Sequence, residues 1–228
     1  YIRKEGKWRD TYKAETNLPE TFEELGELPD EPDRRIKQSE AIYSMIVNGS
    51  SDVEIMNAYP SAYNHLPNMC IRDSPNIQRA RQAVLFEKYR RIRRTGLKVY
   101  YIWGKSGTGK ASGILDAHGD ENVYRVTNYK HPFDGYAGES VILFDEFRSS
   151  LPLVDMLEYL DIYPVSLPSR YADKVACYET AYIVSNYPLE KQYPEVQRDC
   201  PEDWAPFMRR INGGVYEIGA SADADAPF

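Results

Sequence analysis

The segment Gly104–Lys110 has the residue types and spacing of a phosphate-binding loop. It reads GKSGTGK, which fits the pattern G-x-x-x-x-G-K, and it lies between an apolar run and a stretch with helical spacing. Glycines let the backbone fold tightly enough for successive N–H groups to converge on an anion, and the following helix adds the positive end of its dipole. The residues expected to hold a nucleoside triphosphate are Gly104, Lys105, Ser106, Gly107, Thr108, Gly109 and Lys110. The alternative, a glycine-rich turn without a ligand, is disfavoured by the strand before the loop and by the motifs that follow.

The residue after Lys110 departs from the usual loop. This position normally holds Ser or Thr, whose hydroxyl binds Mg²⁺, and it is Ala111 here. Ser112 is a poor substitute, because one step along a helix rotates a side chain by roughly 100°. We therefore expect nucleotide binding through the backbone and Lys110, with hydrolysis as the step that Ala111 impairs.

Two acids follow a second apolar run. Val141–Phe144 precedes Asp145 and Glu146, and Asp145 lies 35 residues after Lys110. Asp145 is expected to hold Mg²⁺ directly or through water, and Glu146 to orient and deprotonate an attacking water. Acids after a strand are also common loop caps, but their distance from the loop favours the catalytic interpretation.

A third apolar run ends in a polar pair. The residues after Tyr182 read IVSN and end in Ser185 and Asn186. The amide of Asn186 is a candidate sensor that contacts the γ-phosphate or its water. A turn-capping asparagine is the competing interpretation.

The elements that must position these residues alternate between strands and helices. Apolar or alternating runs predict strands at 97–104, 121–128 and 139–147 and another ending at 186, with helices at 109–118 and 151–160. This order predicts an α/β fold with a central parallel sheet.

Before the sheet, a small all-α unit is expected. Helical spacing covers residues 33–47, Ser51 and Glu54 form a capping box for a second helix, and a third helix is expected from about Pro75 to Thr95. Residues 69–76 are either a loop insertion or foreign to the protein, so no role is assigned to them.

Composition fits a folded chain of 228 residues with local rather than global basicity. The net charge is −7 and the isoelectric point about 5.1, which argues against a protein that coats nucleic acid. Residues 18–33 hold seven acids and no base, whereas residues 79–98 hold eight bases and one acid. Three widely spaced cysteines fit a reducing compartment and argue against a disulfide framework or zinc knuckle.

The order of these motifs resembles the superfamily 3 helicases, a branch of the AAA+ ATPases. The blocks YRVTNYKHPFDGY, VILFDEFRSS, YLDIYPVSLPSRYADKV and VSNYPLEKQY resemble the replication-associated (Rep) proteins of circular single-stranded DNA viruses and related plasmids, across most of residues 97–212. The resemblance implies an AAA+-like P-loop NTPase with a central parallel sheet, preceded by a small all-α oligomerisation unit. It implies ATP and Mg²⁺ as cofactors, a hexameric ring around single-stranded DNA, no membrane, and action inside the host cell, in the nucleus if the host is eukaryotic.

The resemblance also assigns roles to further residues. The hairpin between Leu167 and Lys174 is expected to contact DNA through Arg170, Tyr171 and Lys174, with an ordinary exposed charged loop as the alternative. Arg209 or Arg210 is expected to act as the arginine finger across a subunit interface, with pairing to an acid as the alternative role for one of them.

The first residues resemble the end of another domain. Rep proteins carry an N-terminal HUH endonuclease whose last motif is Y-x-x-K, and Tyr1-Ile2-Arg3-Lys4 matches it. Tyr1 would then be the DNA-nicking nucleophile, although we expect no nicking by this chain. The expected domains are 1–17 as the endonuclease remnant, 18–33 as an acidic linker, 34–95 as the helical unit, 96–218 as the ATPase and 219–228 as a disordered tail.

The sequence is compatible with three functions. The first is an ATP-dependent DNA helicase in rolling-circle replication. The second is a nucleotide-binding, hydrolysis-impaired DNA-binding oligomer, which Ala111 favours. The third is another P-loop enzyme such as a small-molecule kinase, which the motifs after the acidic pair disfavour.

Overall fold

The computed structural model describes residues 31–60, 75–170, 172–219 and 227–228. The chain divides into two compact units, residues 1–45 and residues 46–228. Of the first unit the structure describes most of helix α1 (Glu31–Val47). The domain boundaries expected from the sequence stay predictions. The oligomerisation role of the helical unit also stays a prediction.

The second unit is built on a five-stranded parallel sheet. Its strands lie in the order β2-β3-β6-β1-β7, and each pairs in parallel with its neighbours. They span Val123–Val126 (β2), Val141–Phe144 (β3), Thr180–Ser185 (β6), Lys98–Trp103 (β1) and Gly214–Glu217 (β7). Because all five strands run the same way, their carboxyl ends meet at one edge of the sheet. The mixed α/β fold with a central parallel sheet, as expected of a P-loop protein, is therefore confirmed.

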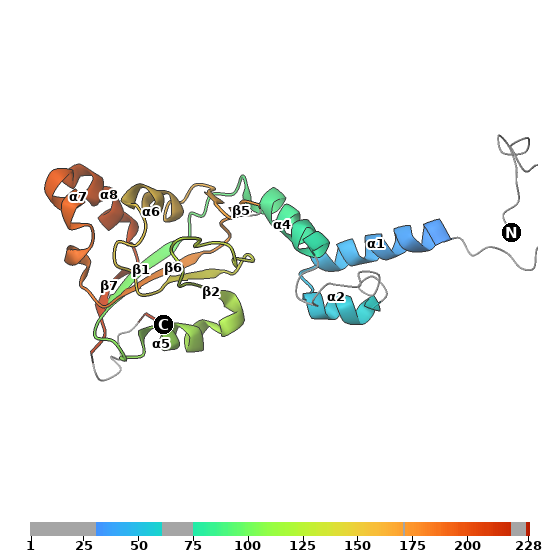
Figure 1. Cartoon of the computed structure of the whole chain (residues 1–228), viewed down its shortest axis with the longest axis horizontal. Helices are drawn as coiled ribbons and strands as arrows, with labels where there is room; N and C mark the ends of the chain where they lie inside the picture. Colours follow the sequence, from blue (N-terminus) through green and yellow to red (C-terminus); the bar gives the residue numbers. More distant parts are fainter. Residues whose placement is uncertain (1–30, 61–74, 171, 220–226) are drawn as a thin grey trace, which may run out of the picture. The chain divides into compact units, whose positions relative to one another are not determined.

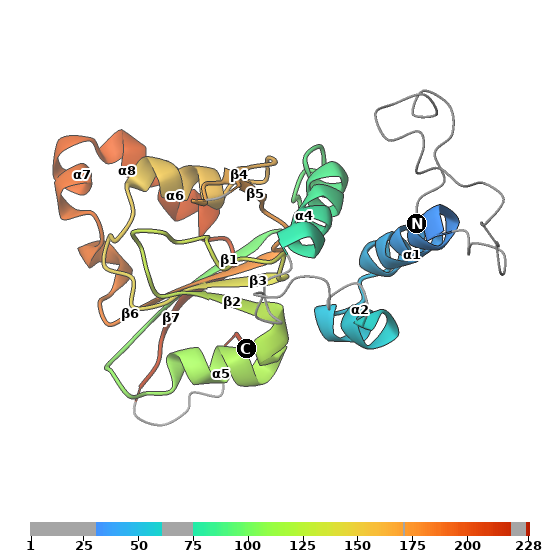
Figure 2. The ribbon, with the colours of Figure 1, turned by 45° about the vertical axis from the view of Figure 1, so that its right-hand side comes forward.

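Helices cover both faces of this sheet. Helix α5 (Lys110–His118) lies on one face, and α6 (Leu153–Tyr159), α7 (Pro194–Asp199) and α8 (Pro201–Arg210) lie on the other (Figures 1 and 2). Short 3-10 turns, η4 (Asp120–Asn122) and η5 (Leu189–Lys191), join α5 to β2 and β6 to α7. The sequence predicted α5 and α6, whereas α7, α8 and β7 were not foreseen.

The core forms two layers because successive strand residues point to opposite faces. On β6, Ile183 packs with the α6–α8 layer, whereas its neighbours Tyr182 and Val184 pack with the α5 layer. All three side chains are buried. A strand buried on both faces reads as a continuous apolar run, which is why the period of two is hidden in the sequence.

For the helices before the sheet, the sequence predicted the first residues better than the last ones. Helix α2 (Asp52–Ala58) begins with the expected capping box between Ser51 and Glu54. Helix α4 (Pro75–Tyr89) lies against β5 and ends six residues before the expected Thr95. The expected end was wrong because Arg94 turns into the protein, where its guanidinium donates to the carbonyls of Tyr159 (3.0 Å) and Asp161 (2.6 Å).

A small antiparallel hairpin follows α6. Strands β4 (Ser166–Leu167) and β5 (Lys174–Val175) pair with each other, which matches the hairpin expected between Leu167 and Lys174.

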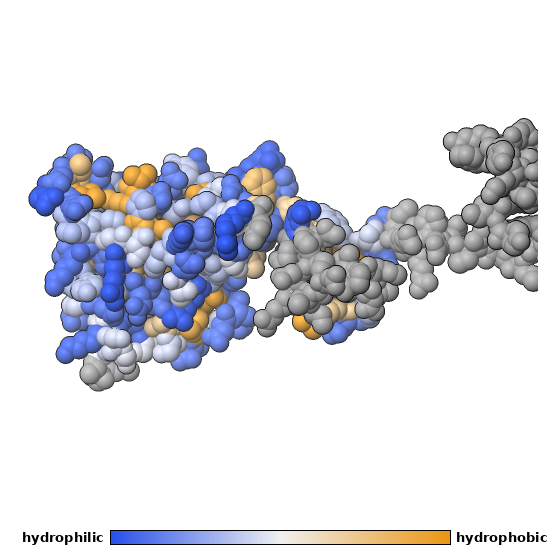
Figure 3. Space-filling model, viewed as in Figure 1, coloured by the Kyte–Doolittle hydropathy of each residue, from blue (hydrophilic) through white to orange (hydrophobic). Residues whose placement is uncertain are grey.

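The surface is mostly polar. On the face shown in Figure 3 apolar areas are small and lie mainly along α6–α8, where Val154 and Met208 are exposed. Among the described residues, no helix combines the length and apolar character needed to cross a bilayer.

Candidate nucleotide-binding site

The loop between β1 and α5 has a backbone that only glycine adopts easily. Gly107 and Gly109 have φ values of 82° and 81°, in the left-handed region. Gly104 has a φ of 152°, and a Cβ there would overlap the carbonyl oxygen of Ile218. Helix α5 begins directly after Gly109, so its free N–H groups face the loop. The loop expected from the sequence is therefore formed as a tight turn at the amino end of a helix.

Lys110 lies inside this loop. Its ammonium group donates to the carbonyls of Gly104 (2.9 Å) and Lys105 (2.7 Å), and it lies 3.3 Å from the hydroxyl of Thr108 and 3.4 Å from Oδ1 of Asn186. Burial lowers the pKa of Lys110, and the nearby carboxylates Asp145 and Glu146 partly oppose that shift. The carbonyl oxygens thus hold the ammonium within the loop, and the oxygens of a bound phosphate can replace them as acceptors.

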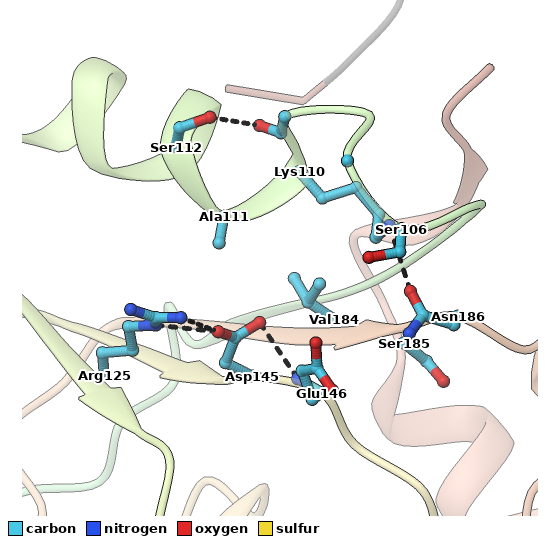
Figure 4. A pocket seen from close by; sticks show the side chains of 12 residues that line it. Ser106, Lys110, Ala111, Ser112, Arg125, Asp145, Glu146, Val184, Ser185 and Asn186 are labelled. Atoms are coloured by element: carbon cyan, nitrogen blue, oxygen red, sulfur yellow. Dashed lines mark hydrogen bonds and ion pairs between the residues drawn. The ribbon is translucent and has the colours of Figure 1, made fainter. Parts of the chain in front are cut away.

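A pocket of about 210 Å³ joins the predicted residues at the carboxyl edge of the sheet. Lys110 comes from the start of α5, Asp145 and Glu146 follow β3, and Asn186 follows β6 (Figure 4). The full lining is Ser106, Gly107, Gly109, Lys110, Ala111, Ser112, Arg125, Asp145, Glu146, Val184, Ser185 and Asn186. Three motifs that are far apart in the sequence therefore share one cavity.

Arg125 lines the pocket, and nothing in the sequence predicted it as a site residue. It lies on β2, and its Nε and Nη2 both donate to Oδ2 of Asp145, Nε at 2.8 Å. The other oxygen of Asp145 accepts the backbone N–H of Glu146 at 3.0 Å. The Asp145 side chain is only 6% exposed, whereas that of Arg125 is 49% exposed. The parallel pairing of β2 with β3 brings these two residues together, and the register of that pairing is not visible in the sequence.

Glu146 has a side chain that is 66% exposed, unlike that of Asp145. Its φ of 51° lies in the left-handed region, where a non-glycine residue is uncommon. Its carboxylate lies 3.5 Å from Arg148, whose guanidinium also lies over the ring of Tyr187. The two adjacent acids thus differ in exposure, and each one has an arginine as its partner.

The donor set for a magnesium ion fits poorly. The side chain of Ala111 points toward Arg125 and Asp145 (Figure 4) and carries no oxygen. The hydroxyl of Ser112 donates to the carbonyl of Gly109 at 2.9 Å instead of facing Asp145. In the part of the chain that the structure describes, no group of three or more His, Cys, Asp or Glu residues is arranged for a metal. Mg²⁺ therefore stays a prediction.

A buried glutamine ties the loops behind the pocket together. Nε2 of Gln192 donates to the hydroxyls of Tyr101 (2.8 Å) and Ser185 (3.1 Å), and its Oε1 accepts the backbone N–H of Ser149 at 2.7 Å. The Ser185 hydroxyl in turn donates to the carbonyl of Phe147 at 2.7 Å. This network links β1, β6 and the segment after Glu146. The sequence did not predict this network, because Gln192 looks like any other polar residue in a loop.

The two candidate arginine fingers have different surroundings. Arg210 is paired with Asp161 and also donates to the carbonyl of Pro206 at 3.1 Å. Burial by itself would raise the pKa of Asp161, but the bonds from Arg210 and from the backbone N–H groups of Ile162 and Tyr163 together hold it below its usual value. Arg209 is exposed, and among the described residues its side chain has no ion pair. The finger role stays a prediction, for which the geometry favours Arg209.

The predicted DNA-contacting residues lie outside the pocket. Arg170 donates through Nε to Asp134 at 2.5 Å, and Lys174 donates to the carbonyls of Asp134 (2.7 Å) and Tyr136 (2.5 Å). Burial lowers the pKa of Lys174. Tyr171 and Tyr1 lie outside the described residues. The DNA-contacting role of all three hairpin residues therefore stays a prediction, as does the role of Tyr1.

Comparison with known proteins gives one consistent set of relatives. The chain is 34% identical to the replication-associated protein of beak and feather disease virus over 114 residues, half of this chain and 37% of that protein. It is 29% identical to the canary circovirus protein of the same name over 124 residues, or 54% of this chain and 40% of that protein. The goose circovirus protein matches over 184 residues at 24% identity, or 80% of this chain and 57% of that protein.

These matches cover only part of each relative. The chain spans between about two fifths and three fifths of the length of these three proteins, and no protein-family model matches it. The relatives agree with the resemblance that the motif order indicated. The chain is therefore a homologue of the replication-associated proteins of circoviruses.

Proposed function

We propose that this chain is the nucleoside-triphosphate-driven DNA helicase part of a viral replication-associated protein that acts in rolling-circle replication. The observation that carries the proposal is the single pocket in which Lys110, Asp145, Glu146 and Asn186 converge. An anion-binding loop, a buried carboxylate, an exposed carboxylate and an amide are groups that enzymes use for phosphoryl transfer to water. The homologous circovirus proteins are named for replication, which supports a role in copying a viral genome.

Within this pocket each residue has a separate task. Backbone N–H groups of the loop and Lys110 hold the phosphates. Glu146 is 66% exposed and points to solvent, so it can reach a water molecule that the buried Asp145 cannot. Asn186 lies beside the ammonium of Lys110, which supports the proposal that both contact the same phosphate.

Single-stranded DNA is the proposed partner, and a hexameric ring the proposed assembly. An acidic chain can bind DNA through a few basic side chains per subunit, since phosphate contacts alone set most of the affinity. Arg170 supports this because its side chain is 56% exposed despite its bond to Asp134. In a ring, the exposed Arg209 would act on the pocket of a neighbouring subunit.

Phosphate release with and without single-stranded DNA tests the proposal. We expect turnover that DNA stimulates and that Glu146→Gln lowers by about a hundredfold or more, because the water loses its base. Glu190→Gln, an exposed carboxylate away from the pocket, serves as the matched control and leaves turnover unchanged. The molar mass of the active species, measured on the same sample, reports the assembly.

The second candidate is a nucleotide-binding, hydrolysis-impaired oligomer. Ala111 and the pairing of Asp145 with Arg125 favour it. Near-background turnover alongside tight ATP binding would support this candidate over the helicase. A phosphorylated acceptor without DNA stimulation would instead identify a kinase.

Restoring a hydroxyl at position 111 separates a missing metal ligand from other causes of slow turnover. For a pocket that works with Mg²⁺, Ala111→Ser is expected to raise turnover by about tenfold, because the bound cation would gain an oxygen ligand. For a pocket that works without the cation, no gain is expected. Ala111→Gly, which adds no oxygen, is the control. Equal turnover of the two variants would show that metal ligation is not what limits the reaction.

A further inference from the structure

We propose that Arg125 takes the place of the divalent cation, so that the pocket binds a nucleoside triphosphate in its metal-free form. This inference rests on the proposed function, because it concerns how the same pocket holds its nucleotide. Three features of the described residues carry it: the missing ligand at position 111, the paired state of both acids, and the free N–H groups of Arg125.

The first feature is chemical. A hard cation needs several oxygen ligands. The Asp145 carboxylate is bonded to the guanidinium of Arg125, and the side chain directed toward it from α5 is the methyl group of Ala111 (Figure 4). Ser112 cannot contribute while its hydroxyl is bonded to the carbonyl of Gly109. The position that would hold a cation between the loop and Asp145 therefore faces one carboxylate and one positive charge.

The second feature is the charge balance of the pocket's charged residues together with Arg148, which lies outside the lining and pairs with Glu146. Arg125 is paired with Asp145, and Arg148 is paired with Glu146. Together with Lys110, these groups are three cations and two carboxylates, so the five of them carry one net positive charge. In a site without these arginines the two acids would repel a polyphosphate, and a divalent cation would be needed to reverse that repulsion. Here the protein supplies the compensating charge itself.

The third feature is the geometry of the guanidinium. Arginine has five N–H donors in a planar fork that suits phosphate oxygens. Arg125 uses Nε and Nη2 for Asp145, and among the described residues Nη1 has no hydrogen-bond partner. The side chain is about half exposed and lines the pocket, and Nη1 lies on the side of the guanidinium away from Asp145 (Figure 4). Asp145 then serves as an anchor that holds the guanidinium in place.

This arrangement makes a prediction opposite to that for a usual phosphate-binding loop. Binding of a triphosphate to the wild-type chain should depend little on Mg²⁺. Removing Arg125 should free Asp145, lose the contact to phosphate, and make binding depend on the cation.

The test is equilibrium binding of a fluorescent N-methylanthraniloyl ATP, measured once with EDTA and once with MgCl₂. For the wild type we expect dissociation constants within about threefold of each other in the two conditions. For Arg125→Ala the ratio of the EDTA value to the Mg²⁺ value should rise to about tenfold or more, the range of a lost charge-assisted hydrogen bond. Arg125→Lys keeps a positive charge, so its ratio of dissociation constants should lie between those of the wild type and Arg125→Ala. Because each variant is compared with itself, a change in its folded fraction cancels.

A matched control removes a cation elsewhere. Lys98 is exposed at the amino end of β1, at the opposite edge of the sheet from the pocket. Lys98→Ala should keep the wild-type ratio, which separates a local effect of Arg125 from a change in net charge.

The outcomes distinguish this inference from the proposed function. Wild-type binding that is lost in EDTA, or an Arg125→Ala ratio equal to that of the wild type, would overturn the role of Arg125 and leave the nucleotide site intact. Absence of binding in both conditions would overturn the nucleotide site, and the inference with it.

Discussion

The phosphate-binding loop and the β4–β5 hairpin both carry basic residues that the sequence marked for phosphate, and they differ in what holds those residues. In the loop, Lys110 donates to carbonyls of the loop that presents it. In the hairpin, Arg170 and Lys174 bond to residue 134, 36 and 40 positions earlier in the chain.

This difference shows which kinds of sequence motif predict the contacts that their residues make in the fold. The loop depends on local backbone geometry that glycines at fixed spacing impose, so its sequence specifies its shape. A basic residue in a hairpin has no such restriction, and any acid or carbonyl that the fold brings near can bind it. Asp134 is such an acid, and its pKa lies below the usual value because it accepts bonds from Arg170.

The largest expected effect compares the two lysines directly. Lys110→Ala should weaken nucleotide binding by about a hundredfold or more, because the loop loses its charge for phosphate. Lys174→Ala, the matched change in the hairpin, should leave nucleotide affinity unchanged. Titration calorimetry with ATP measures both. Unchanged affinity in Lys110→Ala would remove the basis for a nucleotide site.

The two arginines at the end of α8 extend the comparison to stability. Arg210→Ala should lower the free energy of unfolding by about 1–2 kcal/mol, because Asp161 and the carbonyl of Pro206 lose their partner. Arg209→Ala should change it by less than about 0.5 kcal/mol, as expected for an exposed side chain. Urea denaturation of both variants provides the measurement. Equal destabilisation would mean that Arg209 is also held within its own subunit.

The smallest expected effect is the pH dependence of the hairpin contact. The folded pKa of Asp134 lies below its ordinary value of 3.8, so this carboxylate contributes stability above that pH and loses it as the pH falls further. Asp134→Asn should therefore lower the stability at pH 7 and flatten the loss of stability below pH 3.8. Thermal unfolding across pH 2–7 tests this, with Asp173→Asn, also in the hairpin segment, as the control. A wild-type slope in Asp134→Asn would show that the contact contributes nothing.

Much of the fold could be predicted from the sequence. The apolar runs gave four of the five strands of the sheet, the alternation of elements gave its parallel direction, and Ser51 with Glu54 gave the start of α2. The last strand, β7, was missed because its residues alternate between half-buried and exposed and its run is short. The end of α4 was missed because Arg94 reads as a surface residue until its distant carbonyl partners are known.

The sequence by itself determined the phosphate-binding loop, the order of the acidic pair and the asparagine behind it, and the absence of a hydroxyl at position 111. Each of these is local, because a few adjacent residues fix a turn or end a strand. Only the tertiary structure decided that Arg125 meets Asp145, that Gln192 joins the loops behind the pocket, and that Lys174 turns inward. Those contacts join residues that are distant in the chain, and the pairing and packing that bring them together leave no pattern in the residues themselves.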